Sequence, residues 1–251
     1  MHRRPQPTLR SLEDRAGGLE PSEGTNRRVR GCRSPGRTTQ VSSGKDLFLL
    51  VIRLRIGTRG SQLALVQARE VARLLTERGD ARCELVIIRT SGDRMTDQPL
   101  ADAGGKRLFV KEIEDALLAG MIDVAVHSSK DLPVDLPDGL DIGAVLPRED
   151  PVDVWVAREG PAAGFDTVTR GLARGTRIGT GSVRRIAQLR PVLPHARFEP
   201  IRGNVDTRLR KLERGDYDVI VLASAGLRRL NLADRITATI PPDVCVPAPG
   251  Q

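Results

Sequence analysis

Asp123-Val-Ala-Val-His-Ser-Ser-Lys-Asp-Leu-Pro133 is an apolar run of strand length that ends abruptly in polar residues. A short apolar run bounded by turn-forming residues predicts a buried strand, and Pro133 stops any regular element beyond it. The polar cluster then lies at the carboxyl end of a strand, where open α/β sheets place their ligand sites. Lys130 and Asp131 set a cation beside a carboxylate there, a pair that can bind an anion and move a proton at one place.

Strand-length and helix-period segments alternate along the rest of the chain from Val51 onward. Strands are predicted at 53–57, 83–89, 123–127, 140–145, 153–157, 177–179, 196–199 and 219–223. Helices are predicted at 61–77, 108–119, 182–193 and 205–214. Alternation of this kind indicates an α/β protein with mixed, mostly parallel sheets.

Two pairs of segments echo each other. Arg55-Ile-Gly-Thr-Arg-Gly-Ser61 resembles Arg177-Ile-Gly-Thr-Gly-Ser182, and the run that begins at Asp123 resembles the run that begins at Asp218. The echo predicts two lobes on one plan, residues 49–147 and 148–246, that face each other across a cleft. The alternative is that βα units simply look alike.

Composition narrows the class of protein. The 251 residues suffice for one large or two modest domains, and an apolar fraction of 39% is ordinary for a soluble protein. Aromatic residues make up 2%, which disfavours a nucleic-acid binder built on stacking platforms. The net charge of +8 comes mainly from arginine, whose planar fork suits carboxylates and phosphates, although genomic base composition also enriches arginine.

Cysteine, membrane and targeting signals are weak. The three cysteines, Cys32, Cys83 and Cys245, form no CxxC motif and favour neither a disulfide framework nor a metal site. With no membrane-length apolar segment and no secretory signal, a cytoplasmic protein without a membrane partner is expected. Residues 1–48 are rich in Arg, Pro, Ser and Gly and are predicted to be a disordered extension, with a transit peptide as the alternative.

Three turns combine glycine with basic and hydroxyl residues. Turns between a strand and a helix bind anions through free N–H groups and the helix dipole. The first two supply Arg59 and Ser61, and then Thr180, Ser182, Arg184 and Arg185; the third supplies Arg202, Gly203, Asn204 and Arg208. Helix capping and solvated arginine faces are the alternatives. Recurrence at each predicted strand end favours a polyanionic ligand.

Asp131 is the best acid/base candidate, because a carboxylate beside Lys130 can stabilise a developing cation or shuttle protons. His127 lacks the spacing of a metal ligand and is expected to be hydrogen-bonded at the strand end. Gly104 and Gly105 allow close backbone approach or hinge motion before a helix.

The chain resembles the porphobilinogen deaminase (hydroxymethylbilane synthase) family in segments that run in order from about residue 53 to residue 251. These are Arg55-Ile-Gly-Thr-Arg-Gly-Ser-Gln-Leu-Ala-Leu65, Thr90-Ser-Gly-Asp93, Gly104-Gly-Lys-Arg-Leu-Phe-Val-Lys-Glu-Ile-Glu114, Ala125-Val-His-Ser-Ser-Lys-Asp-Leu-Pro133, Arg148-Glu-Asp-Pro151, Ile178-Gly-Thr-Gly-Ser-Val-Arg-Arg185, Ile201-Arg-Gly-Asn-Val-Asp-Thr-Arg-Leu209, Leu222-Ala-Ser-Ala-Gly-Leu-Arg-Arg-Leu230 and Pro247-Ala-Pro-Gly-Gln251.

The resemblance implies two lobes like those of periplasmic binding proteins, a third small α/β domain, and a monomeric transferase. Its reaction condenses four porphobilinogen molecules head to tail, with loss of ammonia, to give hydroxymethylbilane. Asp131 is then the catalytic carboxylate, which contacts pyrrole N–H groups. Primer and substrate carboxylates are then bound by Arg59, Ser61, Ser128, Lys130, Thr180, Ser182, Arg184, Arg185, Arg202, Gly203, Asn204 and Arg208.

Two departures from the family pattern stand out. Position 181 is glycine where many relatives have serine. The family's dipyrromethane cofactor is joined to a cysteine of the third domain, and this sequence stops at Gln251, where residues 247–251 begin the crossover back to the first lobe. We therefore expect a chain without its third domain or anchoring cysteine, inactive or nearly so by itself. A non-catalytic two-lobe binding protein for carboxylates is the alternative from another class, and a nucleic-acid binder is a distant third.

Overall fold

The computed structural model describes residues 52–79, 81–94, 109–158 and 163–251. The predicted extension, residues 1–48, and the pair Gly104 and Gly105 lie outside these ranges.

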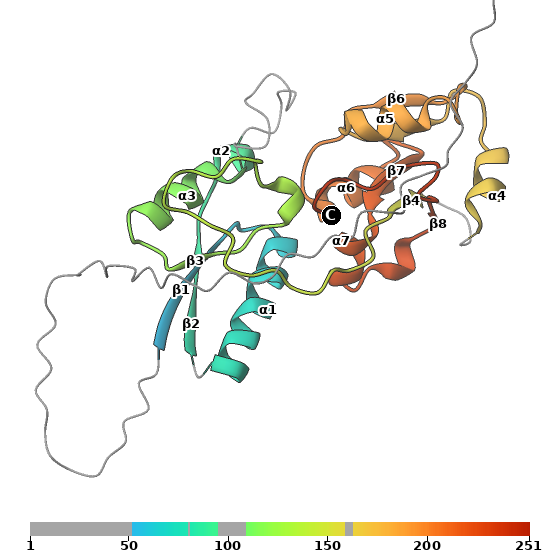
Figure 1. Ribbon diagram of the computed structural model, residues 1–251. Helices are drawn as coiled ribbons and strands as arrows, with labels where there is room; N and C mark the ends of the chain where they lie inside the picture. The colour runs from blue at the N-terminus through green and yellow to red at the C-terminus, as the bar shows by residue number, and fades with distance from the viewer. Residues whose placement is uncertain (1–51, 80, 95–108, 159–162) are drawn as a thin grey trace, which may run out of the picture. The chain divides into compact units, whose positions relative to one another are not determined.

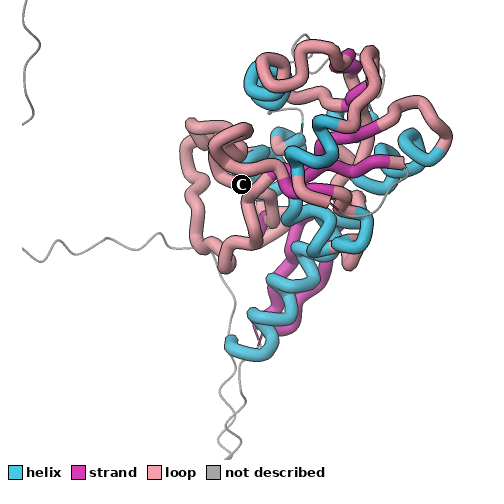
Figure 2. Tube along the Cα trace, turned by 90° about the vertical axis from the view of Figure 1, so that its right-hand side faces the viewer, coloured by secondary structure: helices cyan, strands magenta, loops and turns pink. Residues whose placement is uncertain are grey.

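Among the described residues, the first sheet has three parallel strands in the order β2 (Ala81–Ile87), β1 (Ile52–Thr58) and β3 (Val124–Ala125). The longest described helix, α1 (Gln62–Gly79), packs along β1 and β2 (Figures 1 and 2). Two further helices are α2 (Ser91–Arg94) and α3 (Lys111–Leu118), and a 3-10 turn, η2 (Ser129–Asp131), follows β3. Buried Ile56, Ile113 and Ile122 bring α3 against the sheet.

Within the described ranges, the second sheet has five strands in the order β6 (Arg197–Glu199), β5 (Arg177–Gly179), β7 (Val219–Ala223), β4 (Asp153–Ala157) and β8 (Ala238–Thr239). β5 runs parallel to β6 and β7, while β4 is antiparallel to β7 and β8. Its helical elements are α4 (Phe165–Arg170), α5 (Val183–Leu189), α6 (Val205–Glu213), α7 (Ser224–Arg229) and η3 (Ala233–Arg235).

The centre of the second sheet is apolar on both faces. Successive strand residues point to opposite faces, so Val219 and Val221 of β7 join the hydrophobic cluster of Trp155, while Ile220 and Leu222 join the cluster of Val154. A continuous apolar strand is typical of a central position covered on both sides. Its neighbour β4 begins with Asp153, the one charged residue in an otherwise apolar strand.

The predicted α/β class with mixed, mostly parallel sheets is confirmed. The strand predicted at 140–145 is wrong, because those residues form no regular element and Ile142 and Val145 are exposed. Within the described ranges this apolar run has no strand to pair with. The helix predicted at 182–193 ends earlier, at Leu189. The division into lobes at residue 148 stays a prediction, since Leu49–Gln251 form one compact unit.

Candidate functional site

The turn that carries Asp131 lies beside the first glycine turn. β3 pairs in parallel with β1, and the Val126 N–H donates to the carbonyl of Gly57 at 3.0 Å. Both strands therefore release their next residues at the same edge of the sheet. The Asp131 N–H donates to the Ser128 carbonyl at 2.9 Å and closes the η2 turn.

A small pocket, with a cavity volume of about 50 Å³, opens at this edge. Four of the predicted site residues line it: Arg59, Ser61, Ser128 and Asp131. His127 lines it as well, and burial lowers the pKa of its imidazole below the usual value. We expected His127 to be hydrogen-bonded, but among the described residues its side chain makes no hydrogen bond.

Arg59 is held in place by Asp93 and Phe109, neither of which was a predicted site residue. Its guanidinium binds the carboxylate of Asp93, with Nε 3.1 Å from Oδ1, and its Cζ lies 4.5 Å from the centre of the Phe109 ring. Burial alone raises the pKa of Asp93, but hydrogen bonds and charge from Arg59, together with hydrogen bonds from Thr90, lower it below the usual value overall. The pair fixes the direction in which Arg59 enters the pocket.

The two serines of the pocket have local partners. The Ser61 Oγ accepts a hydrogen bond from the Ala64 N–H at 3.3 Å, which is the capping role that the sequence left open. The Ser128 hydroxyl donates to Oε1 of Gln67 on α1 at 3.0 Å. Both contacts tie the pocket wall to the first turns of α1.

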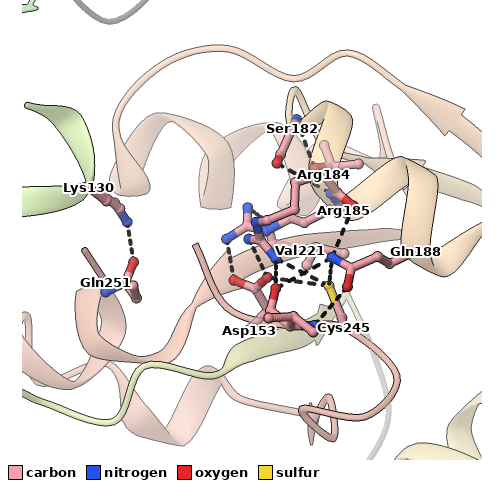
Figure 3. A network of polar contacts seen from close by, with 11 residues as sticks. Lys130, Asp153, Ser182, Arg184, Arg185, Gln188, Val221, Cys245 and Gln251 are labelled. Carbon is pink, nitrogen blue, oxygen red and sulfur yellow. Dashed lines mark hydrogen bonds and ion pairs between the residues drawn. The ribbon is translucent and has the colours of Figure 1, made fainter. Parts of the chain in front are cut away.

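The second glycine turn caps α5 and directs two arginines toward one buried carboxylate. Thr180 is fully buried, its Oγ1 accepts from the Ser182 N–H at 3.2 Å, and the Ser182 Oγ accepts from the Arg185 N–H at 3.4 Å. Arg184 and Arg185 then bind the two carboxylate oxygens of Asp153 at 2.7 Å and 2.6 Å (Figure 3). The sequence predicted these arginines as ligands of substrate carboxylates and missed Asp153.

Cys245 completes the surroundings of Asp153. Its thiol lies 3.6 Å from Oδ2 of Asp153 and 3.4 Å from a guanidinium nitrogen of Arg184. Burial, together with the negative charge of Asp153, raises the pKa of this thiol. For Asp153, burial acts to raise the pKa, but hydrogen bonds and charge from Arg185 and Arg184 hold it below the usual value.

The third turn presents Arg202, Gly203, Asn204 and Arg208 before and within α6. Gly203 has a φ of +108°, and a Cβ there would lie 2.6 Å from Cγ2 of Thr207, so only glycine fits without strain. The Arg208 Nε donates to the Gly203 carbonyl at 2.8 Å. Asn204 precedes the helix without a side-chain cap. Burial, followed by the charges of Arg185 and Arg202, lowers the pKa of Arg208 to about 10.

Lys130 links the turns electrostatically. Its Nζ donates to Oε1 of Gln251 at 2.7 Å. Burial lowers the pKa of Lys130; the charges of Asp131 and Asp153 raise it, while those of Arg185 and Arg208 lower it. Cations from several turns thus act on one another, and an anionic ligand would relieve their repulsion.

In the part of the chain that the structure describes, no group of His, Cys, Asp and Glu side chains can hold a metal ion. No helix of that part is both long and apolar enough to span a bilayer.

Comparison with known proteins gives a consistent result. The family model described as "Porphobilinogen deaminase, dipyromethane cofactor binding domain" matches residues 54–251. Porphobilinogen deaminase of Syntrophus aciditrophicus is 51% identical over 199 residues, which are 79% of this chain and 63% of the relative. That of Geobacter sulfurreducens is 48% identical over 200 residues, 79% of this chain and 61% of the relative. The chain therefore spans about three fifths of the length of these relatives.

Solved structures are more distant. Substrate binding domain 2 of GlnP from Lactococcus lactis is 8% identical with a TM-score of 0.43, over 75% of this chain and 77% of that one. The aliphatic sulphonate binding protein SsuA of Escherichia coli is 15% identical with a TM-score of 0.37, over 74% and 56%. The assignment depends instead on the family model and the curated relatives, and on these grounds the chain belongs to the porphobilinogen deaminase family.

Proposed function

We propose that the chain acts in tetrapyrrole biosynthesis, in the stepwise head-to-tail condensation of four porphobilinogen molecules to hydroxymethylbilane with loss of ammonia. One observation carries the proposal: Asp131 lines a pocket at a strand edge, where burial and the like charges of Arg185 and Arg208 from two other turns lower the pKa of the adjacent Lys130. A carboxylate among cations suits a substrate that carries both carboxylates and a pyrrole N–H.

Asp131 is the proposed catalytic residue. Its carboxylate accepts a hydrogen bond from the pyrrole N–H and stabilises the positive charge that develops on the substrate as ammonia leaves. Electrostatic stabilisation of developing charge by a fixed group is commonly the largest single catalytic contribution. The short η2 turn holds Asp131 at the pocket wall before substrate arrives, so little reorganisation is needed.

Cationic and hydroxyl groups are proposed to bind the acetate and propionate groups. On the side of the first sheet these are Arg59, Ser61, Ser128 and Lys130, and on the side of the second sheet Thr180, Ser182, Arg184, Arg185, Arg202, Gly203, Asn204 and Arg208. Because Arg184 and Arg185 already share Asp153, they contribute less charge to the ligand than their number suggests. Arg208 and Lys130 have no ion pair with a described residue and are the stronger candidates.

The described residues fit a dipyrromethane group. The buried Nε of Arg185 has no hydrogen-bond partner, and the lowered pKa of Arg208 reflects burial and the like charges of Arg185 and Arg202. Both features favour a ligand with several carboxylates, held by Arg185, Arg208 and Lys130. When bound, such a group supplies the nucleophilic pyrrole to which substrate is added.

None of the three cysteines is proposed to carry that group. Cys32, Cys83 and Cys245 do not follow a Gly-Gly pair, which is the anchor that the family resemblance implies. Cys245 is fully buried and engaged with Asp153 and Arg184. We expect the purified chain to show no covalent pyrrole adduct by mass spectrometry and little or no turnover by itself. An adduct on any of the three cysteines would contradict this.

We further propose that the chain is a cytoplasmic monomer that binds porphobilinogen and neither nucleic acid nor membrane. Light scattering after gel filtration tests the oligomeric state directly. A stable dimer, or DNA affinity that falls steeply with salt, would overturn the corresponding part.

Calorimetric binding by the chain itself tests the proposal. Porphobilinogen is expected to bind, a simple dicarboxylate such as succinate to bind more weakly, and Asp131→Asn to lower porphobilinogen affinity by about tenfold through loss of a charge-assisted hydrogen bond. Asp135→Asn, an exposed carboxylate four positions along the same loop, is the matched control and should bind as the parent does. Equal binding of both ligands, unchanged in Asp131→Asn, would favour the carboxylate-binding protein instead.

A further inference from the structure

Asp153 has an unusual position for a charged residue. It is the first residue of β4, only 1% exposed, and pairs across the sheet with Ala223 of β7. Both of its carboxylate oxygens are used: Oδ1 accepts from Arg185 at 2.6 Å, and Oδ2 accepts from Arg184 at 2.7 Å (Figure 3). A buried carboxylate with two guanidinium partners costs desolvation energy, so its presence calls for a role beyond packing.

The contacts of Asp153 orient both arginines. A second guanidinium nitrogen of Arg185 donates to the Val221 carbonyl at 2.8 Å, and the buried Nε of Arg185 has no hydrogen bond. A second guanidinium nitrogen of Arg184 donates to the Val246 carbonyl and to the Cys245 sulfur. Each guanidinium is therefore fixed by hydrogen bonds from two of its nitrogens, and Asp153 is the partner that both guanidiniums share (Figure 3).

The charge of Asp153 also reaches Lys130. The Lys130 ammonium contacts a neutral amide, that of Gln251, and makes no ion pair within the described ranges. Four charged groups act on it: the carboxylates of Asp131 and Asp153, and the guanidiniums of Arg185 and Arg208. Asp153 is thus one of two carboxylates that support the positive charge of Lys130, against burial and two arginines.

We propose that Asp153 is a positioning residue of the proposed site, whose buried carboxylate holds Arg184 and Arg185 in place and couples them to the ammonium group of Lys130. The identity of the ligand rests on the proposed function, while the coupling between Asp153 and Lys130 does not. Since Asp153 is buried beneath both arginines, it acts through them and through Lys130 and does not itself contact substrate.

The titration of Lys130 tests the coupling without any ligand. The sequence has only five lysines, so ε-13C-lysine NMR gives few resonances, and Lys130→Arg assigns the relevant one. Asp153→Asn is expected to lower the pKa of Lys130, and Arg185→Gln to raise it. Lys111, exposed and paired with Asp115 at 2.7 Å, is an internal control and should not move. A purely structural role for Asp153 predicts lower stability with Lys130 unchanged.

The double variant Asp153→Asn with Arg185→Gln keeps the test decisive if the single variant does not fold. It removes opposite charges together, so fewer buried charges are left unpaired. Its Lys130 pKa is expected to return toward that of the parent. If Asp153→Asn folds and leaves the pKa of Lys130 unchanged, the coupling is overturned. If only the double variant folds, a Lys130 pKa equal to that in Arg185→Gln overturns the coupling.

Binding completes the test. Calorimetry with porphobilinogen is expected to show about tenfold weaker binding by Asp153→Asn, or by the double variant, because oriented guanidinium donors are lost. Parent-like affinity in the folded variant would overturn the positioning role. If the parent does not bind porphobilinogen at all, the proposed function fails, while the Lys130 titration still decides the coupling.

Discussion

Replacing Arg208 with methionine is expected to stabilise the folded protein while weakening its binding of anions. The pKa of Arg208 falls below the usual arginine value to about 10, first through burial and then through the charges of Arg185 and Arg202. One pKa unit corresponds to about 1.4 kcal/mol, so the charged guanidinium costs the folded state about 3 kcal/mol at pH 7. The cost is fully present below pH 10, because both folded and unfolded forms are then protonated.

Part of that gain is lost with the side chain. The Arg208 Nε donates to the Gly203 carbonyl at 2.8 Å, a bond worth about 1.5 kcal/mol. The methionine keeps most of the apolar stem, so packing changes little. The net expectation for Arg208→Met is a free energy of unfolding about 1–2 kcal/mol higher than that of the parent.

Urea denaturation followed by tryptophan fluorescence measures this change. Trp155, the only tryptophan, is fully buried in the core of the second sheet and reports its unfolding. Arg210→Met is the matched control: Arg210 lies on the same helix, is exposed, and pairs with Asp206 at 3.4 Å. It should change the free energy of unfolding by no more than about 0.5 kcal/mol.

Ligand addition supplies the second half of the prediction. Porphobilinogen should raise the urea midpoint of the parent and of Arg210→Met, and raise that of Arg208→Met much less. A less stable Arg208→Met would refute the electrostatic reasoning. A ligand-induced rise as large as that of the parent would refute the assignment of Arg208 to the anion site.

Three further predictions concern stability. Asp93→Asn should lower the free energy of unfolding by about 1–3 kcal/mol at pH 7 and by less at pH 3. The pKa of Asp93 is lowered on folding, so the stability that its carboxylate contributes is present above the unfolded pKa and is lost as pH falls. An equal loss at both pH values in urea titrations would contradict this. Gly203→Ala should cost about 1–3 kcal/mol in thermal denaturation, because its φ of +108° and the 2.6 Å approach to Thr207 strain any Cβ, and an unchanged Tm would count against that geometry. Ile220→Ala should cost about 2–5 kcal/mol in urea, since Ile220 is fully buried in β7, and a loss below 1 kcal/mol would show that the core collapses around it.

The sequence was sufficient to predict the α/β class and the edge of the first sheet at which the site residues lie. The apolar run at Asp123 and the turns that follow β1 and β5 are local patterns, and local patterns predict elements and their carboxyl ends. Arg59, Ser61, Ser128 and Asp131 consequently line one pocket, as their shared edge of the sheet implied.

The partners of the arginines could not be predicted. Asp153 is 31 residues from Arg184, and Asp93 is 34 residues from Arg59. The residues next to an aspartate in the sequence do not show whether its carboxylate is a buried counter-ion or is solvated, because burial depends on how distant strands meet. The strand predicted at 140–145 fails for a related reason: an apolar run becomes a strand only where another strand offers hydrogen bonds, and the described ranges contain none for it.

Porphobilinogen turnover by a chimera tests the central claim most directly. The 200-residue segment of this chain that matches the Geobacter sulfurreducens relative replaces its counterpart there, and hydroxymethylbilane is measured with Asp131 intact and with Asp131→Asn. The proposed role of Asp131 predicts turnover by the intact chimera and a loss of at least about a hundredfold in the variant. Turnover that is equal in the two proteins, or a folded intact chimera that forms no hydroxymethylbilane, would contradict it.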